Sequence, residues 1–494
     1  MQHPKKTIDA RLRAAADLAL EAVRGITNPL AADVGCDHGY LTAYLLRQRM
    51  DIHVVASDIS APSLRKAELL LNPEIYGGRV CFRVADGLAS LKPEETPDVI
   101  IMAGMGGQLI LNMLRAGQER IGGASLVLQA NLDIPQLRSG LAEMGYVVRQ
   151  ERYAEAGGRQ YAVLLASAGE TQKLTEKESL LGNSTEENSA GRMRYLETQR
   201  AQRIGEMRKA SEKKTEKGLQ KMEEAARQAA WIAEELGMKA CTVQDVWELV
   251  NRIAPFETAE PWDNVGLLLG SKTAPVQRVL VALDVTAGVV EEARKLGCQL
   301  ILTHHPFMFH AVKRMTDDDR EGALMLAMAK VGLSHIAAHT NLDKAPGGVN
   351  DTLLAVVGCT DVQGSAFVRV GTLPEGLTFG ELSRRVAEAL HAQVRTYGAP
   401  DSPVHSLGCC SGSGAEEYHA AMEMGADCFL TGEVRHNVAL DAVHDGCPII
   451  EAGHYETERP VCDRLTDTLQ KTSDELKYNL TFFSSSVDPF GRGV

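Results

Sequence analysis

The sequence has no two cysteines in a C-x-x-C arrangement, and no apolar run approaches the roughly 18 residues of a membrane-spanning helix. Its ten cysteines are scattered through apolar stretches, which argues against both a disulfide framework and a thiolate zinc site. Residues 1–25 have no apolar core of the kind that signal peptides contain. From these absences we expect a reduced, cytoplasmic protein that does not enter a membrane.

An excess of positive charge is also missing, since 52 Lys and Arg residues stand against 65 Asp and Glu residues, a net charge of −13. An evenly spread charge of this sign would repel nucleic acid, so a nucleic-acid substrate requires a local basic patch. No G-x-x-x-x-G-K-[ST] loop is present for a nucleoside triphosphate. The 494 residues exceed what one hydrophobic core can organise, and we expect two or three domains.

Short runs rich in β-branched and apolar residues alternate with helix-like stretches from Leu30 to about Ala166. The runs are LAADV, HVVASD, VCFRVAD, DVIIMAG, SLVLQA and YAVLLA. This alternation is typical of βαβ units, which form a doubly wound parallel sheet. We therefore predict an α/β chain in which residues 1–168 form a Rossmann-like domain.

The next segment is polar, and Glu, Lys, Arg and Ala dominate it. We predict a coiled-coil-like helical hairpin over residues 169–236, ended by Gly237. Between residues 192 and 227 eleven Lys or Arg residues face six Asp or Glu residues, a local balance of +5 in an acidic chain. A charge run of this kind is usually a solvated helix face, and contact with nucleic-acid phosphates is the equally weighted alternative.

A loop that could hold a cofactor follows the first predicted strand. The chain turns at Gly35 and Gly39 between the apolar run that ends near Asp33 and a helical stretch. Glycines at such a turn let the backbone approach a ligand at the carboxyl end of the strand. Asp37 stands where a dinucleotide-binding fold has a glycine, so its carboxylate would face a pyrophosphate. A cationic sulfonium cofactor fits that charge better than NAD does.

Acidic residues also end the second and third predicted strands. Asp58 ends the second strand, where a carboxylate can accept both ribose hydroxyl hydrogens. Asp86 and Gly87 end the third strand, where an acidic side chain could accept the amino group of adenine. The order of these residues along the chain favours a nucleoside-containing cofactor.

Four segments resemble the bacterial tRNA (adenine-22-N1)-methyltransferases: DVGCDHGYL, VADGL, AGMGG and LVLQANLDIPQLRSGLAEMGYVV. The resemblance spans roughly residues 8–236 and implies S-adenosyl-L-methionine as cofactor and tRNA as partner. The motif positions and the resemblance give the expected cofactor-binding residues Asp33, Gly35, Gly39, Asp58, Asp86, Gly87 and Gly104. The alternative is a methyltransferase that acts on a small molecule.

Three polar residues are expected to border the target base, namely Asp37, His38 and Asn131. Each of them can instead be a loop-capping residue. Ala130 departs from the family, which typically has a proline between Gln129 and Asn131. No general base is assigned, because positioning of the two reactants supplies most of the catalysis in methyl transfer from a sulfonium.

Histidines concentrate in the second half, where eleven of the fourteen lie beyond residue 239. His304 and His305 follow the apolar run Leu300–Leu302, and His339 and Asp343 follow another. His454 and Glu458 are four residues apart, which places them on one face of a helix. Nitrogen and carboxylate ligands suit Zn, Fe, Mn, Ni or Co, and two such ions side by side can lower the pKa of water.

This half resembles the dinuclear-metal proteins known as GTP cyclohydrolase 1 type 2 homologues. PWDNVGLLLG, LDVT, THHPF, AHTNLD, TGEVRHN and GHYETERP carry the resemblance over about residues 239–494. It implies an α/β domain that binds two divalent transition-metal ions through His304, His305, Asp343, His454 and Glu458, with His339 as a further member. It also implies a homo-oligomer, because the family forms toroidal hexamers.

Two hypotheses remain for the function of the second half. The first is metal-assisted hydrolysis of a nucleotide or another small phosphate-bearing compound, and the second is a non-catalytic metal-binding scaffold. The loop from Cys410 to Gly414 could cradle a phosphate through backbone N–H groups, although a simple strand-to-helix turn is the favoured reading. Together the halves predict two α/β enzymes fused in tandem and joined by a helical segment.

Overall fold

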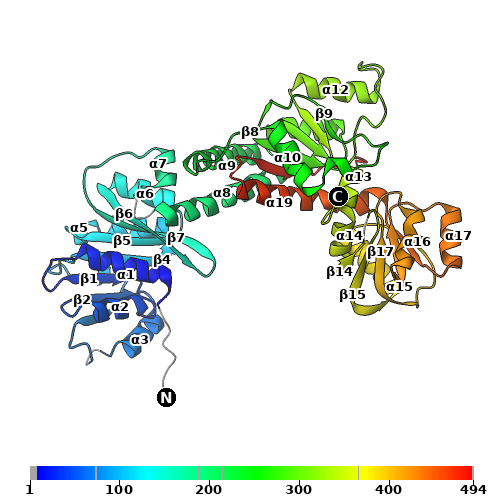
Figure 1. Ribbon diagram of the computed structural model, residues 1–494. Coiled ribbons are helices and arrows are strands. Elements are labelled where there is room, and N and C mark those ends of the chain that lie inside the picture. Colours follow the sequence, from blue (N-terminus) through cyan, green and yellow to red (C-terminus); the bar gives the residue numbers. More distant parts are fainter. Residues whose placement is uncertain are drawn as a thin grey trace. The chain divides into compact units, whose positions relative to one another are not determined.

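The chain folds into two compact units in the computed structural model, which describes residues 8–72, 75–183, 185, 189–213, 215–364 and 366–491. The first unit holds the residues up to Met207 together with Gln220–Leu236. The second unit holds Arg208–Leu219 and the residues from Gly237 onward. In Figure 1 the first unit is mainly blue and cyan, and the second runs mainly from green to red.

The first unit is built on a seven-stranded sheet in the order β3-β2-β1-β4-β5-β7-β6 (Figure 1). Strands β1 to β5 run parallel, and β7 is antiparallel to both of its neighbours. The strands are β1 (Leu30–Val34), β2 (His53–Asp58), β3 (Val80–Val84), β4 (Val99–Gly106), β5 (Ser125–Leu132), β6 (Tyr146–Ala156) and β7 (Arg159–Ala168).

Helices connect these strands and begin at side-chain caps in several places. Asp9 accepts a hydrogen bond from the N–H of Leu12, and Ser60 accepts one from Ser63, which satisfies helix-end donors. The helices are α1 (Ala10–Ala22), α2 (Tyr40–Gln48), α3 (Ala61–Leu70), η1 (Gly87–Ser90), α4 (Gly107–Ala116), α5 (Gln118–Ile121), α6 (Ile134–Glu143), α7 (Glu176–Leu181), α8 (Ser189–Glu212) and α9 (Glu216–Glu235).

The predicted α/β fold class is confirmed, and the six predicted strands of this unit are present. The sheet is not wholly parallel as predicted, because β6 and β7 form an antiparallel hairpin at one edge. Gly157 and Gly158 have φ values of 56° and 73°, the left-handed backbone that a tight hairpin turn requires. Long helices occur over 169–236 as expected, and α9 ends before Gly237, whose φ is 65°. The division into a separate hairpin segment stays a prediction.

The second unit contains two sheets and a two-stranded pair, β10-β8. The first sheet has the order β20-β11-β12-β13-β9, and the second has the order β14-β15-β17-β18-β19-β16. The strands are β8 (Cys241–Thr242), β9 (Gly266–Leu269), β10 (Pro275–Val276), β11 (Arg278–Ala282), β12 (Leu300–Thr303), β13 (Ser334–Ala337), β14 (Thr360–Gln363), β15 (Arg369–Thr378), β16 (Arg395–Tyr397), β17 (Pro403–Cys409), β18 (Cys428–Thr431), β19 (Ile449–Glu451) and β20 (Thr481–Ser484).

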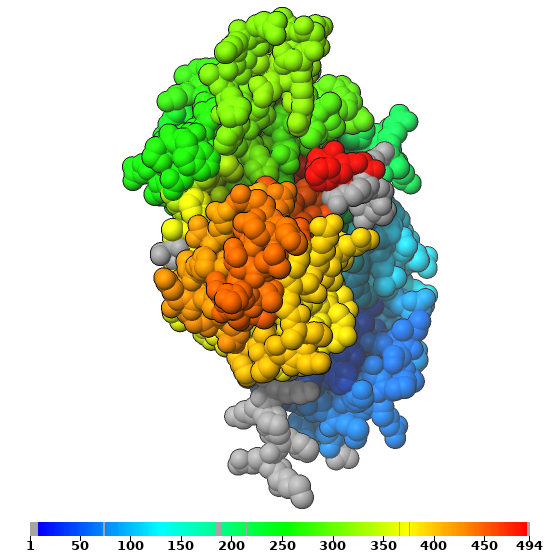
Figure 2. Space-filling view, turned by 90° about the vertical axis from the view of Figure 1, so that its right-hand side faces the viewer, coloured from blue at the N-terminus to red at the C-terminus, as the bar shows by residue number. Residues whose placement is uncertain are grey.

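Each of these sheets is packed against helices of the same unit. Figure 2 shows a green part and an orange part of this unit, with the red C-terminal residues where the two meet. The helices are α10 (Val243–Ile253), η3 (Phe256–Thr258), α11 (Ala287–Leu296), α12 (Arg320–Lys330), α13 (Thr340–Lys344), α14 (Val349–Val357), α15 (Phe379–Leu390), η4 (Ala415–Glu417), α16 (Tyr418–Glu423), α17 (His436–His444), α18 (His454–Glu458) and α19 (Pro460–Glu475).

Parallel pairing decides where polar side chains of the second unit can meet. Strands β11, β12 and β13 are parallel, so their carboxyl ends lie at one edge of the first sheet. Strands β17, β18 and β19 are parallel in the second sheet, so their carboxyl ends also share an edge. Because ligand sites of α/β sheets lie beyond the carboxyl ends of the strands, both edges are places for a site.

The cysteines are all free thiols, and nine of the ten are buried, as the sequence predicts. Buried free cysteines behave as small apolar side chains within the core. No helix in the described part of the chain combines the length and the apolar character needed to cross a membrane.

Candidate cofactor pocket and metal centre

A pocket of about 620 Å³ opens at the carboxyl ends of β1, β2 and β4 in the first unit. Nine of the ten residues expected to hold the cofactor or border the target base line it: Asp33, Gly35, Asp37, His38, Asp58, Asp86, Gly87, Gly104 and Asn131. The exception is Gly39. An added Cβ at Gly39 would meet Ala67 Cβ at 2.9 Å, so this glycine allows close packing of α2 on α3.

The carboxylate of Asp58 is held in place by the loops that follow β1 and β2. Its Oδ2 accepts a hydrogen bond from the N–H of Asp37 at 3.0 Å, and its Oδ1 accepts one from Ser60 at 2.7 Å. The loop after β1 therefore depends on the acid that ends β2. Asp33 is buried beneath this loop, and burial raises its pKa to about 6 although Thr42 Oγ1 donates to it at 2.5 Å.

Asn131 is anchored on three sides. Its Nδ2 donates to the carbonyl oxygen of Gly104 at 2.8 Å, while its Oδ1 accepts from Arg11 Nη1 at 2.9 Å and from Gln129 Nε2 at 3.2 Å. Arg11 also lines the pocket, a position that no motif in the sequence indicates. The amide of Asn131 therefore has a fixed orientation at the pocket rim.

His38 lies at the same rim and is partly exposed. Its Nδ1 is 2.6 Å from Asp37 Oδ2, and its Nε2 is 3.2 Å from Lys66 Nζ. Gly104 has a φ of 84°, and an added Cβ there would meet nothing within 4 Å. This open space next to the Gly104 backbone is available to a ligand that lies in the pocket.

The predicted metal ligands converge between the two sheets of the second unit. Glu458 Oε2 is 2.9 Å from His305 Nε2, 3.2 Å from His454 Nε2 and 4.0 Å from His304 Nε2. His304 Nε2 is in turn 3.5 Å from Asp343 Oδ1. The five residues predicted from three separate segments are thus brought together.

His339 belongs to the same cluster. The ligand atoms of His304, His305 and His339 lie within 4.8 Å of one another, and so do those of His305, His454 and Glu458. His305 is common to the two groups, so the cluster contains two adjacent groups that could each hold a metal ion.

Three buried atoms in this cluster make no well-aligned hydrogen bond among the described residues: His304 Nε2, Asp343 Oδ1 and Glu458 Oε2, the last of which has His305 Nε2 as its nearest imidazole nitrogen at 2.9 Å. Buried polar atoms are nearly always satisfied, because each unsatisfied one destabilises the fold by about 1 to 3 kcal/mol. These atoms are one imidazole nitrogen and two carboxylate oxygens, which lie 3.5 Å and 4.0 Å from that nitrogen. This donor set fits a divalent transition-metal ion.

A second layer of acceptors orients the imidazoles. His304 Nδ1 donates to the carbonyl oxygen of Ala338 at 3.0 Å, which leaves its Nε2 as the lone-pair atom. His305 Nδ1 donates to Asp284 at 2.9 Å, and His339 Nδ1 donates to Asp263 at 2.9 Å. Carboxylates and carbonyls behind metal-binding histidines fix the tautomer and the ring orientation.

The electrostatics of the cluster separate His304 from His305. Burial lowers the pKa of His304 to about 3, so its ring is neutral as a ligand must be. Burial alone would lower the pKa of His305 too, but Asp284 and Glu458 raise it to about 10. Burial and the charge of Glu458 raise the pKa of Asp343 well above its usual range. Asp284 and Glu458 thus hold a proton on His305, which a metal ion bound at its Nε2 would displace.

His335, which the sequence leaves unassigned, supports His305 from beneath. The imidazole of His335 is fully buried, and its Nε2 lies 2.7 Å from Thr303 Oγ1. Thr303 Oγ1 in turn donates to the backbone oxygen of His305 at 2.7 Å. His335 is thus a positioning residue and not a member of the cluster.

The loop Cys410–Gly414 adopts the favoured turn. Its N–H groups at Ser411 and Gly412 donate to Asn350 Oδ1 at 2.8 Å and Thr457 Oγ1 at 3.2 Å, and Gly414 donates back to Ser411 at 3.2 Å. Amides bonded in this way are not available to a phosphate. The backbone of Gly412 lies against Glu458 and His454 instead.

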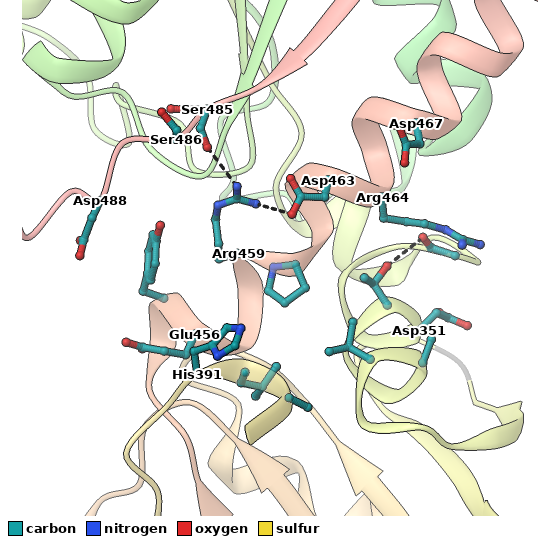
Figure 3. A pocket seen from close by; sticks show the side chains of 18 residues that line it. Asp351, His391, Glu456, Arg459, Asp463, Arg464, Asp467, Ser485, Ser486 and Asp488 are labelled. Carbon is teal, nitrogen blue, oxygen red and sulfur yellow. Dashed lines mark hydrogen bonds and ion pairs between the residues drawn. The ribbon is translucent and has the colours of Figure 1, made fainter. Parts of the chain in front are cut away.

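A separate cavity of about 930 Å³ lies behind α18, between α14, α15, α19 and the residues that follow β20 (Figure 3). Arg459 points into it but is held by Asp463 at 3.2 Å and by the backbone oxygen of Ser485 at 3.0 Å. Tyr455 and Glu456 line this cavity, while their neighbours His454 and Glu458 belong to the metal cluster.

Comparison with known proteins matches each half to a family. Residues 241–489, half of the chain, match the family described as Duf34/NIF3 (NGG1p interacting factor 3). The chain belongs to the Duf34/NIF3 family. Residues 31–232 match the family described as tRNA (adenine(22)-N(1))-methyltransferase. The first half of this Duf34/NIF3 protein is therefore an S-adenosylmethionine-dependent tRNA methyltransferase domain, and the chain is an enzyme.

Individual relatives cover one half of the chain at a time. A GTP cyclohydrolase 1 type 2 homolog of Clostridium acetobutylicum is 30% identical over 261 residues, which are 50% of this chain and 97% of the relative. The hypothetical protein SA1388 of Staphylococcus aureus has a solved structure with a TM-score of 0.50 at 26% identity, covering 52% of this chain and 100% of that one. The tRNA methyltransferase TrmK of B. subtilis is 26% identical with a TM-score of 0.40, covering 46% and 98%.

Proposed function

We propose that the first unit transfers a methyl group from S-adenosylmethionine to N1 of an adenine in tRNA. The cofactor supplies an activated methyl group on its sulfonium. The pocket beyond β1, β2 and β4 supports this proposal, because Asp58, Asp86 and the open space at Gly104 line one cavity. The fixed amide of Asn131 at its rim would orient the target base, so that the chain contributes chiefly positioning.

Asp58 provides the first test. Asp58→Asn keeps the size of the side chain but removes the charge that strengthens hydrogen bonds to the ribose hydroxyls, a loss of about 1.5 to 3 kcal/mol. We expect S-adenosylmethionine to bind at least tenfold more weakly in isothermal titration calorimetry. Asp98→Asn is the matched control, because Asp98 accepts from Leu30 N at 2.8 Å at the opposite end of the strands. Equal affinities for both variants and the wild type would contradict the assignment.

Contact with tRNA is proposed for helices α8 and α9, and the structure narrows the basic residues available. Arg192 and Arg200 are buried. Arg203, Arg208 and Arg227 form ion pairs, of which Arg208 uses Asp467 at 2.7 Å and the backbone oxygen of Phe482 at 2.9 Å. Lys214 lies outside the described residues. The exposed basic residues that remain are Arg194, Lys209, Lys213, Lys217 and Lys221.

We expect the variant with Lys209, Lys213, Lys217 and Lys221 replaced by Ala to bind tRNA more weakly and with a flatter salt dependence. Each lost phosphate contact lowers the slope of log K against log salt by about 0.7 to 0.9. Fluorescence anisotropy with labelled tRNA at several salt concentrations measures this slope. The control replaces Lys272, Lys313, Lys330 and Lys471, exposed lysines outside α8 and α9, with the same change in net charge. If both sets of substitutions weaken tRNA binding equally, the exposed lysines of α8 and α9 form only a solvated helix face and not a tRNA-binding surface.

For the second unit we propose a dinuclear metal centre with hydrolase activity on a small phosphate-bearing compound. The three unsatisfied buried atoms of His304, Asp343 and Glu458 carry this proposal. His305 and His454 are the other two proposed ligands, and Glu458 Oε2 contacts the Nε2 atoms of both. His339 is an additional imidazole of the cluster. Two divalent ions would lower the pKa of water and neutralise an anionic substrate. The resemblance of the second half to the GTP cyclohydrolase 1 type 2 homologues also leads us to propose a ring-shaped homo-oligomer. Analytical ultracentrifugation of the full chain tests this proposal.

A further inference from the structure

Two aromatic rings lie exposed beside the metal cluster. Trp262 is 59% exposed and Phe309 is 41% exposed, although both are large apolar side chains. Their ring centroids are 5.9 Å apart. The imidazole of His339 is 6.4 Å from Trp262 and 6.3 Å from Phe309, edge-on to each. The two rings therefore border the side of the cluster at which His339 lies.

The backbone segments that carry the two rings are held by hydrogen bonds of neighbouring residues. Trp262 directly precedes Asp263, which accepts from His339 Nδ1 at 2.9 Å and from the N–H of Thr340 at 3.0 Å. Asn264 Nδ2 donates to the carbonyl oxygen of Met308 at 2.6 Å, which links the segment of Trp262 to that of Phe309. The same short segments thus position a metal-site histidine and the two rings.

The exposure of these rings is not explained by contacts within the chain. Neither ring takes part in a cation–π contact in the described ranges, where six such contacts involve other rings. Exposed aromatic groups next to polar, convergent side chains are typical of ligand sites, because a flat π-face binds another flat ring. Base stacking on aromatic side chains is strong and tolerates different bases.

We propose that Trp262 and Phe309 form a stacking site for a planar heteroaromatic ring, of the nucleobase type, in the substrate of the metal centre. The inference rests on the proposed hydrolase function and specifies its substrate class. The ring of the substrate lies on Trp262 and Phe309, and its anionic part extends toward His339 and the metal ligands. A phosphate compound without a planar ring lacks this contact and binds more weakly.

The test uses the metal-loaded full chain in isothermal titration calorimetry, with S-adenosylhomocysteine present to occupy the pocket of the first unit. Guanosine 5′-monophosphate is the probe with a ring, and ribose 5-phosphate is the probe without one. We expect ribose 5-phosphate to bind at least tenfold more weakly. Trp262→Ala and Phe309→Ala should each weaken binding of guanosine 5′-monophosphate by about tenfold or more and leave ribose 5-phosphate unchanged. Trp262→Phe should retain much of the affinity.

Phe490→Ala is the control, since Phe490 is another exposed ring of the second unit, 66% exposed and 6.0 Å from Tyr455. Equal binding of the two probes, or variants that bind both like the wild type, would overturn the stacking site. Loss of metal in Trp262→Ala would show a purely structural role, and a changed oligomeric mass would show that a second copy covers the rings. A wild-type chain that takes up no metal would refute the hydrolase proposal. The same two titrations on the metal-free chain would then test the stacking site by itself, because Trp262 and Phe309 are not among the proposed metal ligands.

Discussion

We expect Glu458→Gln to lose at least one of two bound metal ions per chain and to lower the melting temperature of the second unit. Glu458 Oε2 is buried, makes no well-aligned hydrogen bond in the described structure, and lies within 4.0 Å of Nε2 atoms on three histidines. An amide oxygen there has no negative charge to offset two metal ions, and the amide N–H₂ would face imidazole nitrogens. Since metal binding contributes directly to folded-state stability, loss of metal and loss of stability should occur together.

Glu456→Gln is the matched control for this substitution. It makes the same chemical change two residues earlier on α18, but Glu456 lines the adjacent cavity rather than the metal cluster. Inductively coupled plasma mass spectrometry gives metal per chain, and calorimetric scanning with and without chelator gives the transitions. The first unit has its own core, and we expect its transition to be nearly unaffected. A wild-type protein that binds no Zn, Mn, Fe, Co or Ni would contradict the metal centre and favour a scaffold.

The sequence indicated which residues of this cluster lie together because strand ends are easy to recognise. His304 and His305 stand directly after an apolar run, and parallel β12 brings them to the sheet edge where His339 also lies. His454 and Glu458 are four residues apart on α18, as their spacing indicates. The side chain of a residue that follows a buried parallel strand lies at the edge of the sheet. Its approximate place in the site can therefore be predicted from the apolar run that precedes it in the sequence.

The supporting residues could not be assigned in this way. Asp284 and Asp263 act through other side chains, and their roles depend on distances that no spacing contains. Both lie in the segments LDVT and PWDNVGLLLG that carry the family resemblance, which was the one available signal. His335 was unassignable for the same reason, because its contact with Thr303 crosses from β13 to β12.

Counting charges proved a weaker guide than finding strand ends. Eleven basic residues fall between 192 and 227, yet some are buried and others are paired with acids. Arg208 illustrates the difference, since it contacts Asp467 and Phe482 of β20 within the second unit. Sequence cannot separate such residues from exposed ones, because side-chain partners lie far away along the chain. The expected binding surface is therefore smaller than the composition indicates.

Gly412→Ala should disrupt the metal centre although position 412 carries no ligand. Gly412 has a φ of 58°, a left-handed conformation in which Ala is disfavoured by about 1 to 2 kcal/mol. An added Cβ would collide with Glu458 Oε1 and lie 3.1 Å from His454 Nε2. The loop cannot withdraw, because the Gly412 oxygen accepts from Gly432 N at 3.0 Å and Glu433 N at 2.9 Å. The carboxylate of Glu458 must move instead, and that movement takes it away from the histidine nitrogens with which it would bind the metal.

Gly446→Ala separates this effect from backbone strain. Gly446 has a φ of 83°, and a Cβ there would meet nothing within 4 Å, so Ala introduces the same left-handed strain without a collision. Both variants should therefore lose about 1 to 2 kcal/mol of folding free energy in chelator. Only Gly412→Ala should lose metal and the additional stability that the metal confers. If the two variants bind metal equally, the Gly412 backbone does not hold Glu458 in place, and the proposed role of this contact is wrong.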